Sequence, residues 1–444
     1  MEIDEPLGKP TLDFIRDSGL KGSKEVCHEG DCGACMILLG ELKGEELVYR
    51  AVTSCILPLG EVEAKHVVTI EGINQEKLSP IQQALVDTGG VQCGYCTPGF
   101  VISLTGFFMK SKLGNEDILT AIEGNVCRCT GHASIIRAAK LLSEKYSSVK
   151  QSNQSWIKSL IDEGILPGYF EGIKEKLKEL KKAKRQTKGR LVAGGTDLFV
   201  QNETIDNPVF LSNMGLDKIW SDNDFIHIGT MANTEQIRLS PELNMILDIE
   251  EHLSTVSSLP IRKQATIGGN IANASPIGDL TIYFLALNAD ISIRLDEVNR
   301  IIKLKDFYKG YKILDLQEGE ILEWVRIRNE KKLFSFEKVA KREHLDIASV
   351  NSALSFTLID NKMKEIQLSA GGIGPIPMIL EKTSALLENK EISSSLIKEA
   401  AEIALTEISP IDDVRGSAKY KSLLLRQLIY AHFLKLFPAM EESL

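Results

Sequence analysis

Eight cysteines constrain this chain more than any other feature, because all of them lie within the first 129 of its 444 residues. The N-terminus lacks the charged-then-apolar order of a signal peptide, and disulfides rarely persist in a reducing cytosol. Thiols gathered in this way therefore indicate metal ligands. They form two sets of four, Cys27-x4-Cys32-x2-Cys35 followed by Cys55, and Cys93-x2-Cys96 followed by Cys127-x-Cys129.

The first set has the spacing of a plant-type [2Fe–2S] site. Such a cluster takes two thiolates on each iron, and the protein supplies three from one tight loop and the fourth from elsewhere. Gly30 and Gly33 lie between the loop cysteines, where positive φ angles let backbone N–H groups turn toward the sulfurs. The alternative is a structural zinc site, but zinc usually binds two C-x2-4-C pairs, and Cys55 stands alone.

The second set fits zinc and a [2Fe–2S] cluster equally by spacing alone. The C-x-C pair is not the commoner zinc spacing, and the eight cysteines divide into two complete sets, so we predict two clusters. His28 and His132 lie near the cysteines. A Rieske site needs two histidines on one iron, and with four thiols in each set both are interpreted as neighbours of the ligands or as surface residues.

Apolar periodicity predicts a multidomain α+β protein with four domains, at residues 1–71, 72–147, 156–330 and 334–444. The first is a small α+β module with a helix at Thr11–Asp17 and strands at Cys35–Leu39, Leu47–Thr53 and Val67–Ile70. The second is a four-helix bundle, and the polar segment Ser147–Ser155 after it is a predicted linker. Its helices are expected at Pro80–Val86, Phe100–Lys112, Asn115–Gly124 and Ser134–Lys145.

The third predicted domain is an α+β nucleotide-binding domain, and the fourth has strands after Phe334 and then helices ending in Tyr420–Phe437. Ile173, Leu177 and Leu180 predict an amphipathic helix in the basic stretch Lys174–Arg190. Strands of the third domain are expected at Leu191–Gly195, Ile226–Gly229, Ala289–Arg294 and Ile301–Lys305.

Charge and hydropathy exclude two classes of partner. The formal net charge of −9 and the pI near 5.5 argue against nucleic acid, which binds clustered Lys and Arg. The longest mostly apolar segment, Gly99–Met109, is about half of the ~20 residues that a membrane span needs. We therefore expect a cytoplasmic protein.

Two Gly-Gly segments, Leu191–Leu198 and Ala265–Asp279, predict turns whose backbone N–H groups can approach a pyrophosphate. Neither matches the GxGxxG of a Rossmann site or a Walker A loop, so as isolated patterns they are also typical of ordinary turns.

Three strings together resemble the molybdenum hydroxylase family: KEVCHEGDCGAC at Lys24–Cys35, QCGYCTPGF at Gln92–Phe100 and GNVCRCTGHASI at Gly124–Ile135. The resemblance implies that the first set holds the cluster nearer the flavin in a ferredoxin-like β-grasp domain. The second set then holds the cluster nearer the molybdenum cofactor in a four-helix bundle. Gln92 and Cys129 are implied to face the pterin of a partner subunit, and His132 stands where a tyrosine is usual.

Both Gly-Gly segments are similar to the FAD-binding segments of the same family, in a PCMH-type domain. The string Ser417–Lys421 is also similar, so the resemblance extends from about Thr11 to Phe437. Lys338 is implied to lie near the flavin ring. The other implied FAD contacts are Ala193, Gly194, Gly195, Thr196, Asp197, Thr266, Gly269, Asn270, Asn273 and Asp279.

The resemblance implies the small subunit of an enzyme of the xanthine dehydrogenase type. A separate molybdopterin-binding large subunit is expected, in a heterotetramer of two small and two large subunits. Electrons are implied to pass from the second set to the first, then to FAD and NAD+. The alternatives are another molybdenum hydroxylase, acting on an aldehyde, a nicotinate-like ring or an aromatic thioester, and a zinc-stabilised binding module without redox activity.

Only ten residues precede the predicted helix Thr11–Asp17, where the family has two strands. Glu2–Asp4 can supply part of one at most. A missing inner strand leaves backbone groups of its neighbour unpaired. We therefore expect the natural chain to begin upstream of Met1, or the first cluster to be fragile.

Overall fold

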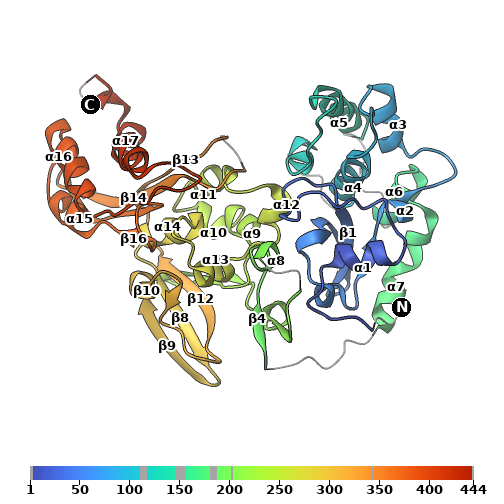
Figure 1. Cartoon of the computed structure of the whole chain (residues 1–444), viewed down its shortest axis with the longest axis horizontal. Helices are drawn as coiled ribbons and strands as arrows, with labels where there is room; N and C mark the ends of the chain where they lie inside the picture. Colours follow the sequence, from blue (N-terminus) through green and yellow to red (C-terminus); the bar gives the residue numbers. More distant parts are fainter. Residues whose placement is uncertain are drawn as a thin grey trace. The chain divides into compact units, whose positions relative to one another are not determined.

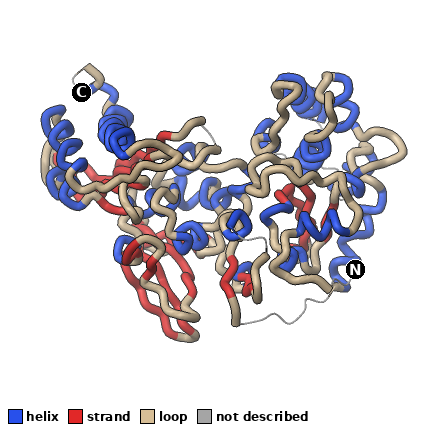
Figure 2. The backbone as a smooth tube through the Cα atoms, in the orientation of Figure 1, coloured by secondary structure: helices blue, strands red, loops and turns tan. Residues whose placement is uncertain are grey.

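The computed structural model describes residues 4–110, 118–146, 156–180, 188–201, 204–342 and 345–442. The chain divides into two compact units, which are drawn together in Figures 1 and 2 and described separately below. Unit 1 consists of Met1–Phe210 with Ser258–Gln264, and unit 2 of Leu211–Ser257 with Ala265–Leu444. The predicted linker Ser147–Ser155 lies outside the described residues. The multidomain α+β class is confirmed.

Unit 1 contains a three-stranded antiparallel sheet of order β2-β1-β3. Its strands are β1 (Met36–Lys43), β2 (Glu46–Thr53) and β3 (His66–Val68), and the helix α1 (Thr11–Asp17) has the predicted bounds. The prediction that the third strand continues to Ile70 is wrong, because the short helix α2 (Ile70–Ile73) begins there. Ile70 and Ile73 are thereby buried in the same apolar core as Leu38 of the central strand.

Three α-helices of unit 1 pack on this core. The helix α4 (Thr97–Phe108) is apolar on all sides and almost wholly buried, with α3 (Pro80–Asp87) and α5 (Ala133–Tyr146) beside it. A capping box of Ser79 and Gln82 starts α3. A full α-helix was expected at Asn115–Gly124, but its described part is the 3₁₀ helix η3 (Ile118–Ile122), which buries only two side chains.

The rest of unit 1 holds short elements, among them a parallel pair of strands, β4 and β5. In α7, Ile173 and Leu177 are buried as predicted, but the described helix ends at Glu179 and Leu180 is exposed. The helix expected through Lys174–Arg190 is therefore shorter in the described residues. These elements are α6 (Trp156–Asp162), α7 (Ile173–Glu179), β4 (Arg190–Val192), α8 (Leu198–Gln201), β5 (Pro208–Phe210) and α12 (Leu259–Arg262).

Unit 2 contains a five-stranded antiparallel sheet of order β6-β7-β12-β8-β9. Its strands are β6 (Ile219–Ser221), β7 (Phe225–Gly229), β12 (Ile321–Arg328), β8 (Asp290–Leu295) and β9 (Val298–Lys303). One apolar core joins this sheet to the helices between its strands. Those helices are α9 (Thr234–Arg238), α10 (Pro241–Asn244), α11 (Ile249–Ser254), α13 (Ile267–Asn273) and α14 (Asp279–Ala286).

The C-terminal part of unit 2 pairs a four-stranded sheet, of order β13-β14-β15-β16, with three helices. The long helix α17 (Ala418–Leu436) contacts β13 and β14. None of the described helices is both long enough and apolar enough to cross a membrane. The elements are β13 (Leu333–Val339), β14 (Val350–Ile359), β15 (Lys362–Gly371), β16 (Met378–Ile379), α15 (Glu381–Leu387), α16 (Ser394–Leu405) and α17.

Candidate functional site

The thiols of the first set lie together in unit 1. Cys35 ends the loop just before β1, and Cys55 lies in a 3₁₀ turn directly after β2. The Ser54 hydroxyl donates to the carbonyl of Cys35 at 2.7 Å, which fixes the two ligand segments side by side. Hydrogen bonds from the thiols of Cys32 and Cys55 lower the pKa of Cys27, and a hydrogen bond with Cys55 lowers the pKa of Cys35. The four sulfurs therefore form one connected group.

Positive φ angles shape the loop of the first set, as the glycines predicted. Gly30 has φ +77° and Gly33 has φ +66°. The backbone N–H of Glu29 points at the sulfur of Cys27, with an N–S distance of 3.4 Å. Such contacts stabilise thiolates. His28 pairs with exposed Glu25, with Nε2 and Oε1 2.7 Å apart.

The thiols of the second set meet in two pairs. The sulfurs of Cys93 and Cys129 are 3.4 Å apart. The other pair is Cys96 and Cys127: burial and a hydrogen bond with Cys127 raise the pKa of Cys96 to about 12. Thr130 donates its hydroxyl to Cys127 Sγ at 3.0 Å. All eight cysteines are free thiols.

No group of three or more His, Cys, Asp or Glu side chains within the described ranges converges closely enough to hold a metal ion. In the second set the thiols approach one another two by two, whereas in the first set Cys27 contacts Cys32 and Cys55, and Cys55 also contacts Cys35. Two sulfurs for each iron is the arrangement that a dinuclear cluster needs.

The two cysteine loops touch each other through their backbones. Val126 donates its N–H to the carbonyl of Cys32 at 3.0 Å. A Cβ on Gly33 would lie 2.5 Å from the carbonyl oxygen of Gly124, and Asn125 Nδ2 donates to the carbonyl of Gly33 at 3.3 Å. Only glycine permits this approach, so the two sets are neighbours within unit 1.

The first Gly-Gly turn, Ala193–Asp197, lies in unit 1 between β4 and α8. Gly195 has φ +72°, which favours glycine. Gln264 donates to the carbonyl of Gly194 at 2.9 Å, and the Asp197 carboxylate accepts a hydrogen bond from Gln201. Thr196 completes the turn.

The second Gly-Gly segment lies in unit 2 at the start of α13. The Thr266 hydroxyl accepts a hydrogen bond from the N–H of Gly269 at 3.1 Å. The Asn270 side-chain oxygen accepts from both the N–H and the hydroxyl of Thr281, at 3.0 and 2.9 Å. Lys312 donates to the Asn273 side-chain oxygen at 3.1 Å.

Asp279 and Lys338 form an ion pair in unit 2, with Oδ2 and Nζ 2.9 Å apart and both side chains largely buried. The other oxygen of Asp279 accepts from Asn351 Nδ2 at 2.6 Å. Asn351 Oδ1 is buried and has no hydrogen-bond partner among the described residues. These contacts bring together two residues that the sequence implied for flavin and add Asn351.

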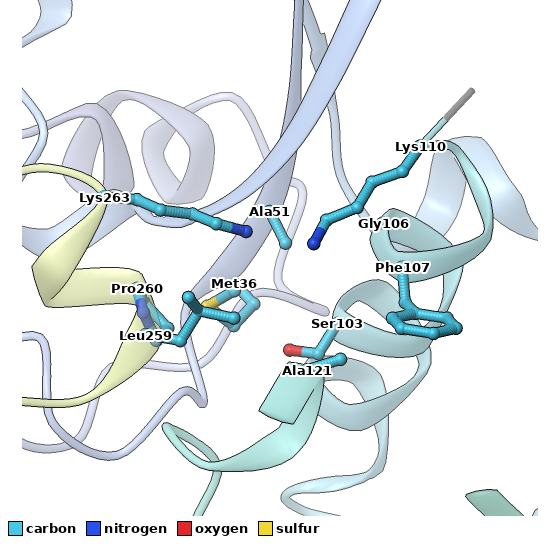
Figure 3. A pocket seen from close by; sticks show the side chains of 10 residues that line it. All are labelled: Met36, Ala51, Ser103, Gly106, Phe107, Lys110, Ala121, Leu259, Pro260 and Lys263. Carbon is cyan, nitrogen blue, oxygen red and sulfur yellow. The ribbon is translucent and has the colours of Figure 1, made fainter. Parts of the chain in front are cut away.

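A pocket in unit 1 is separate from all of these residues. It is lined by residues of β1, β2, α4, η3 and the segment around α12, and the amino groups of Lys110 and Lys263 point toward each other (Figure 3). None of the cysteines and none of the implied FAD contacts lines it.

Three protein-family profiles match segments of this chain. A profile described as "[2Fe-2S] binding domain" matches residues 69–140, which include the whole second set. A profile described as "FAD binding domain in molybdopterin dehydrogenase" matches residues 173–328, and "CO dehydrogenase flavoprotein C-terminal domain" matches residues 335–436. The chain belongs to the iron–sulfur and FAD-binding proteins of the molybdenum hydroxylase family.

Members of the molybdenum hydroxylase family are similar to the chain over nearly its whole length. Xanthine dehydrogenase 1 of Arabidopsis thaliana is 26% identical over 95% of the chain, and aldehyde oxidase 4 of Cavia porcellus is 24% identical over 99%. The chain spans only 38% and 39% of these two proteins. In fold, it is similar to carbon monoxide dehydrogenase from Hydrogenophaga pseudoflava, with a TM-score of 0.52, 22% identity and coverage of 55% of this chain and 87% of that one.

Sequence reasoning missed three side chains of the site, namely Asn125, Gln264 and Asn351. Each makes its contacts with residues distant in the sequence: Asn125 with Gly33, Gln264 with Ile56 and Gly194, and Asn351 with Asp279. A single buried amide gives no periodic signal, so nothing in the local pattern marked them.

Proposed function

We propose that this chain is the electron-transferring small subunit of a molybdenum hydroxylase, and that it holds two [2Fe–2S] clusters and one FAD. The observation that carries the proposal is that eight free thiols form two neighbouring groups of four. The first set and the second set each supply the four thiolates of one cluster. When bound, the clusters pass single electrons and the flavin collects two.

The chain also fits FAD. Gln264 Oε1, beside the Gly194 turn, and Asn351 Oδ1, beside Asp279, are buried acceptors without a partner among the described residues. Buried acceptors are normally satisfied, so each can take a donor from a ligand. We propose the Ala193–Asp197 turn, Thr266, Gly269, Asn270, Asn273, Asp279 and Lys338 as FAD contacts.

Metal and flavin analysis of the purified chain tests the proposal. We expect about four irons, about four acid-labile sulfides and one FAD per chain, since two dinuclear clusters need that stoichiometry. A preparation that holds mainly zinc and shows no visible absorption contradicts it and favours the zinc-stabilised module.

We further propose a separate molybdopterin-binding partner in a heterotetramer; the match of residues 173–328 to the profile described as "FAD binding domain in molybdopterin dehydrogenase" supports such a partner. Exposed Gln92 and Cys129 are proposed to face the pterin. We also propose xanthine as substrate, NAD+ as acceptor and a cytoplasmic location; similarity to proteins named xanthine dehydrogenase supports the substrate. Turnover of xanthine compared with an aldehyde, by the complex purified from its native host, tests the substrate.

A further inference from the structure

The segment Ser258–Gln264 belongs to unit 1, although the residues on both sides of it belong to unit 2. It forms α12, in which the N–H of Arg262 donates to the carbonyl of Ser258 at 2.8 Å. These seven residues belong to a different compact unit from their neighbours in the sequence. Their contacts within unit 1 are therefore made with residues that are distant in the sequence.

Three side chains of this segment lie against the loops that carry the cysteines. Arg262 is almost fully buried and pairs with Glu123, with Nη2 and Oε2 3.0 Å apart. A Cβ on Gly124 would lie 2.7 Å from the ring of Pro260. A Cβ on Gly30, in the first-set loop, would lie 3.2 Å from the side chain of Ile261. The segment therefore packs on both sets.

Gln264 connects the first set to the first Gly-Gly turn. Its amide nitrogen donates to the carbonyl of Ile56 at 2.7 Å and to the carbonyl of Gly194 at 2.9 Å. Ile56 directly follows the ligand Cys55. Two carbonyl acceptors fix the orientation of the amide, because its oxygen would be repelled there. Gln264 is 7% exposed, and its Oε1 has no hydrogen-bond partner among the described residues.

We propose that Gln264 is a positioning residue that couples FAD binding to the cluster of the first set. Its nitrogen ties the backbone next to Cys55 to the Gly194 turn, and its oxygen accepts a hydrogen bond from an O–H or N–H group of FAD bound at that turn. This inference rests on the proposed function. A coupling of this kind is reciprocal. The free energy by which bound FAD shifts the midpoint potential of the first-set cluster equals the free energy by which reduction of that cluster changes the affinity for FAD.

The substitution Gln264→Met tests the coupling, because methionine keeps the length of the side chain and removes both donors and the acceptor. We expect iron content to stay at the wild-type level and the dissociation constant of FAD to rise about tenfold, the scale of one or two net hydrogen bonds. Removal of FAD should shift the midpoint potential of the first-set cluster in the wild type and shift it less in Q264M. The second-set potential should not change.

Gln75→Met is the matched control, since Gln75 Nε2 also donates to a backbone carbonyl, that of Gly164 at 2.9 Å, but on the surface. It should behave as the wild type. Wild-type FAD affinity in Q264M, or equal shifts of both cluster potentials, overturns the proposal. If Q264M does not fold, the test is made on the wild-type chain alone. A midpoint potential of the first-set cluster that does not change when FAD is removed also overturns the proposal. A wild-type chain without iron or without FAD contradicts the proposed function instead.

Discussion

The two cysteine sets differ in how far the chain encloses them. In the first set Cys35 and Cys55 are 2% and 3% exposed, whereas in the second set Cys93 and Cys129 are exposed. Both lie in unit 1 and touch through their loops, so the difference arises from local packing. An enclosed site beside an open one suits the proposed direction of electron flow, from a partner at the surface toward the interior.

We expect the largest difference between the two sets when one proposed ligand is removed from each. We expect Cys55→Ser to abolish the first-set EPR signal and to lower the melting temperature, because the buried serine hydroxyl costs roughly 1–3 kcal/mol without a partner. Cys129→Ser should abolish the second-set signal with little change in melting temperature, because Cys129 is exposed. EPR and thermal melts measure both. Loss of both signals in Cys129→Ser would show that the sets are not independent.

Glycine substitution sharpens the same contrast without removing a ligand. Gly33→Ala places a Cβ 2.4 Å from Asn125 Nδ2 and 2.5 Å from the Gly124 carbonyl, in addition to a positive φ. Gly94 also has a positive φ, but a Cβ there meets nothing within 4 Å. We expect Gly94→Ala to cost about 1–2 kcal/mol of unfolding free energy and Gly33→Ala about 1–3 kcal/mol more. Equal costs in urea denaturation would mean that the loops relax apart.

These contrasts also show what the sequence could and could not predict. Helix α1, the strands near both first-set segments and the division into two sets follow from local periodicity and spacing. The bond between Val126 and Cys32 does not, because it joins segments that are distant in the chain. Gln264 and Ile56 are 208 residues apart. No short window of sequence contains both partners, so only the folded chain brings them together.

Acid should weaken the sheet of the first set through His66. Burial lowers the pKa of His66 to about 4, and Tyr49 OH lies 2.7 Å from its Nδ1. The unfolded chain takes up this proton near pH 6.5, so the stabilisation is complete above pH 6.5 and is lost as the pH falls toward 4. We expect a loss of about 1–2 kcal/mol after allowance for solvent screening.

Urea denaturation of the metal-free chain at pH 7 and pH 5 measures this loss. His66→Gln keeps an acceptor for Tyr49 but does not titrate, so its stability should change less between the two pH values. A variant with the full wild-type pH dependence would assign the effect to other groups.

The smallest effect is expected in the second set, at His132. Its Nε2 lies 3.1 Å from the backbone nitrogen of Cys127 and accepts that N–H. Phe100 packs edge-on against the same ring, with centroids 5.7 Å apart. His132→Phe keeps an aromatic ring at this position and removes the acceptor. We expect a loss of about 1 kcal/mol of unfolding free energy, because the N–H of Cys127 becomes unpaired in a buried residue.

His132→Asn provides the control, since asparagine retains a side-chain acceptor and tolerates the positive φ of 65° at this position. The first-set EPR signal should be unchanged in both variants, because the ring of His132 contacts Cys127 in the second-set loop and Phe100 in α4. If His132→Phe is as stable as the wild type in urea, solvent reaches the N–H of Cys127. The second set is then open on both sides, and its contrast with the enclosed first set is greater than the exposed fractions of the cysteines indicate.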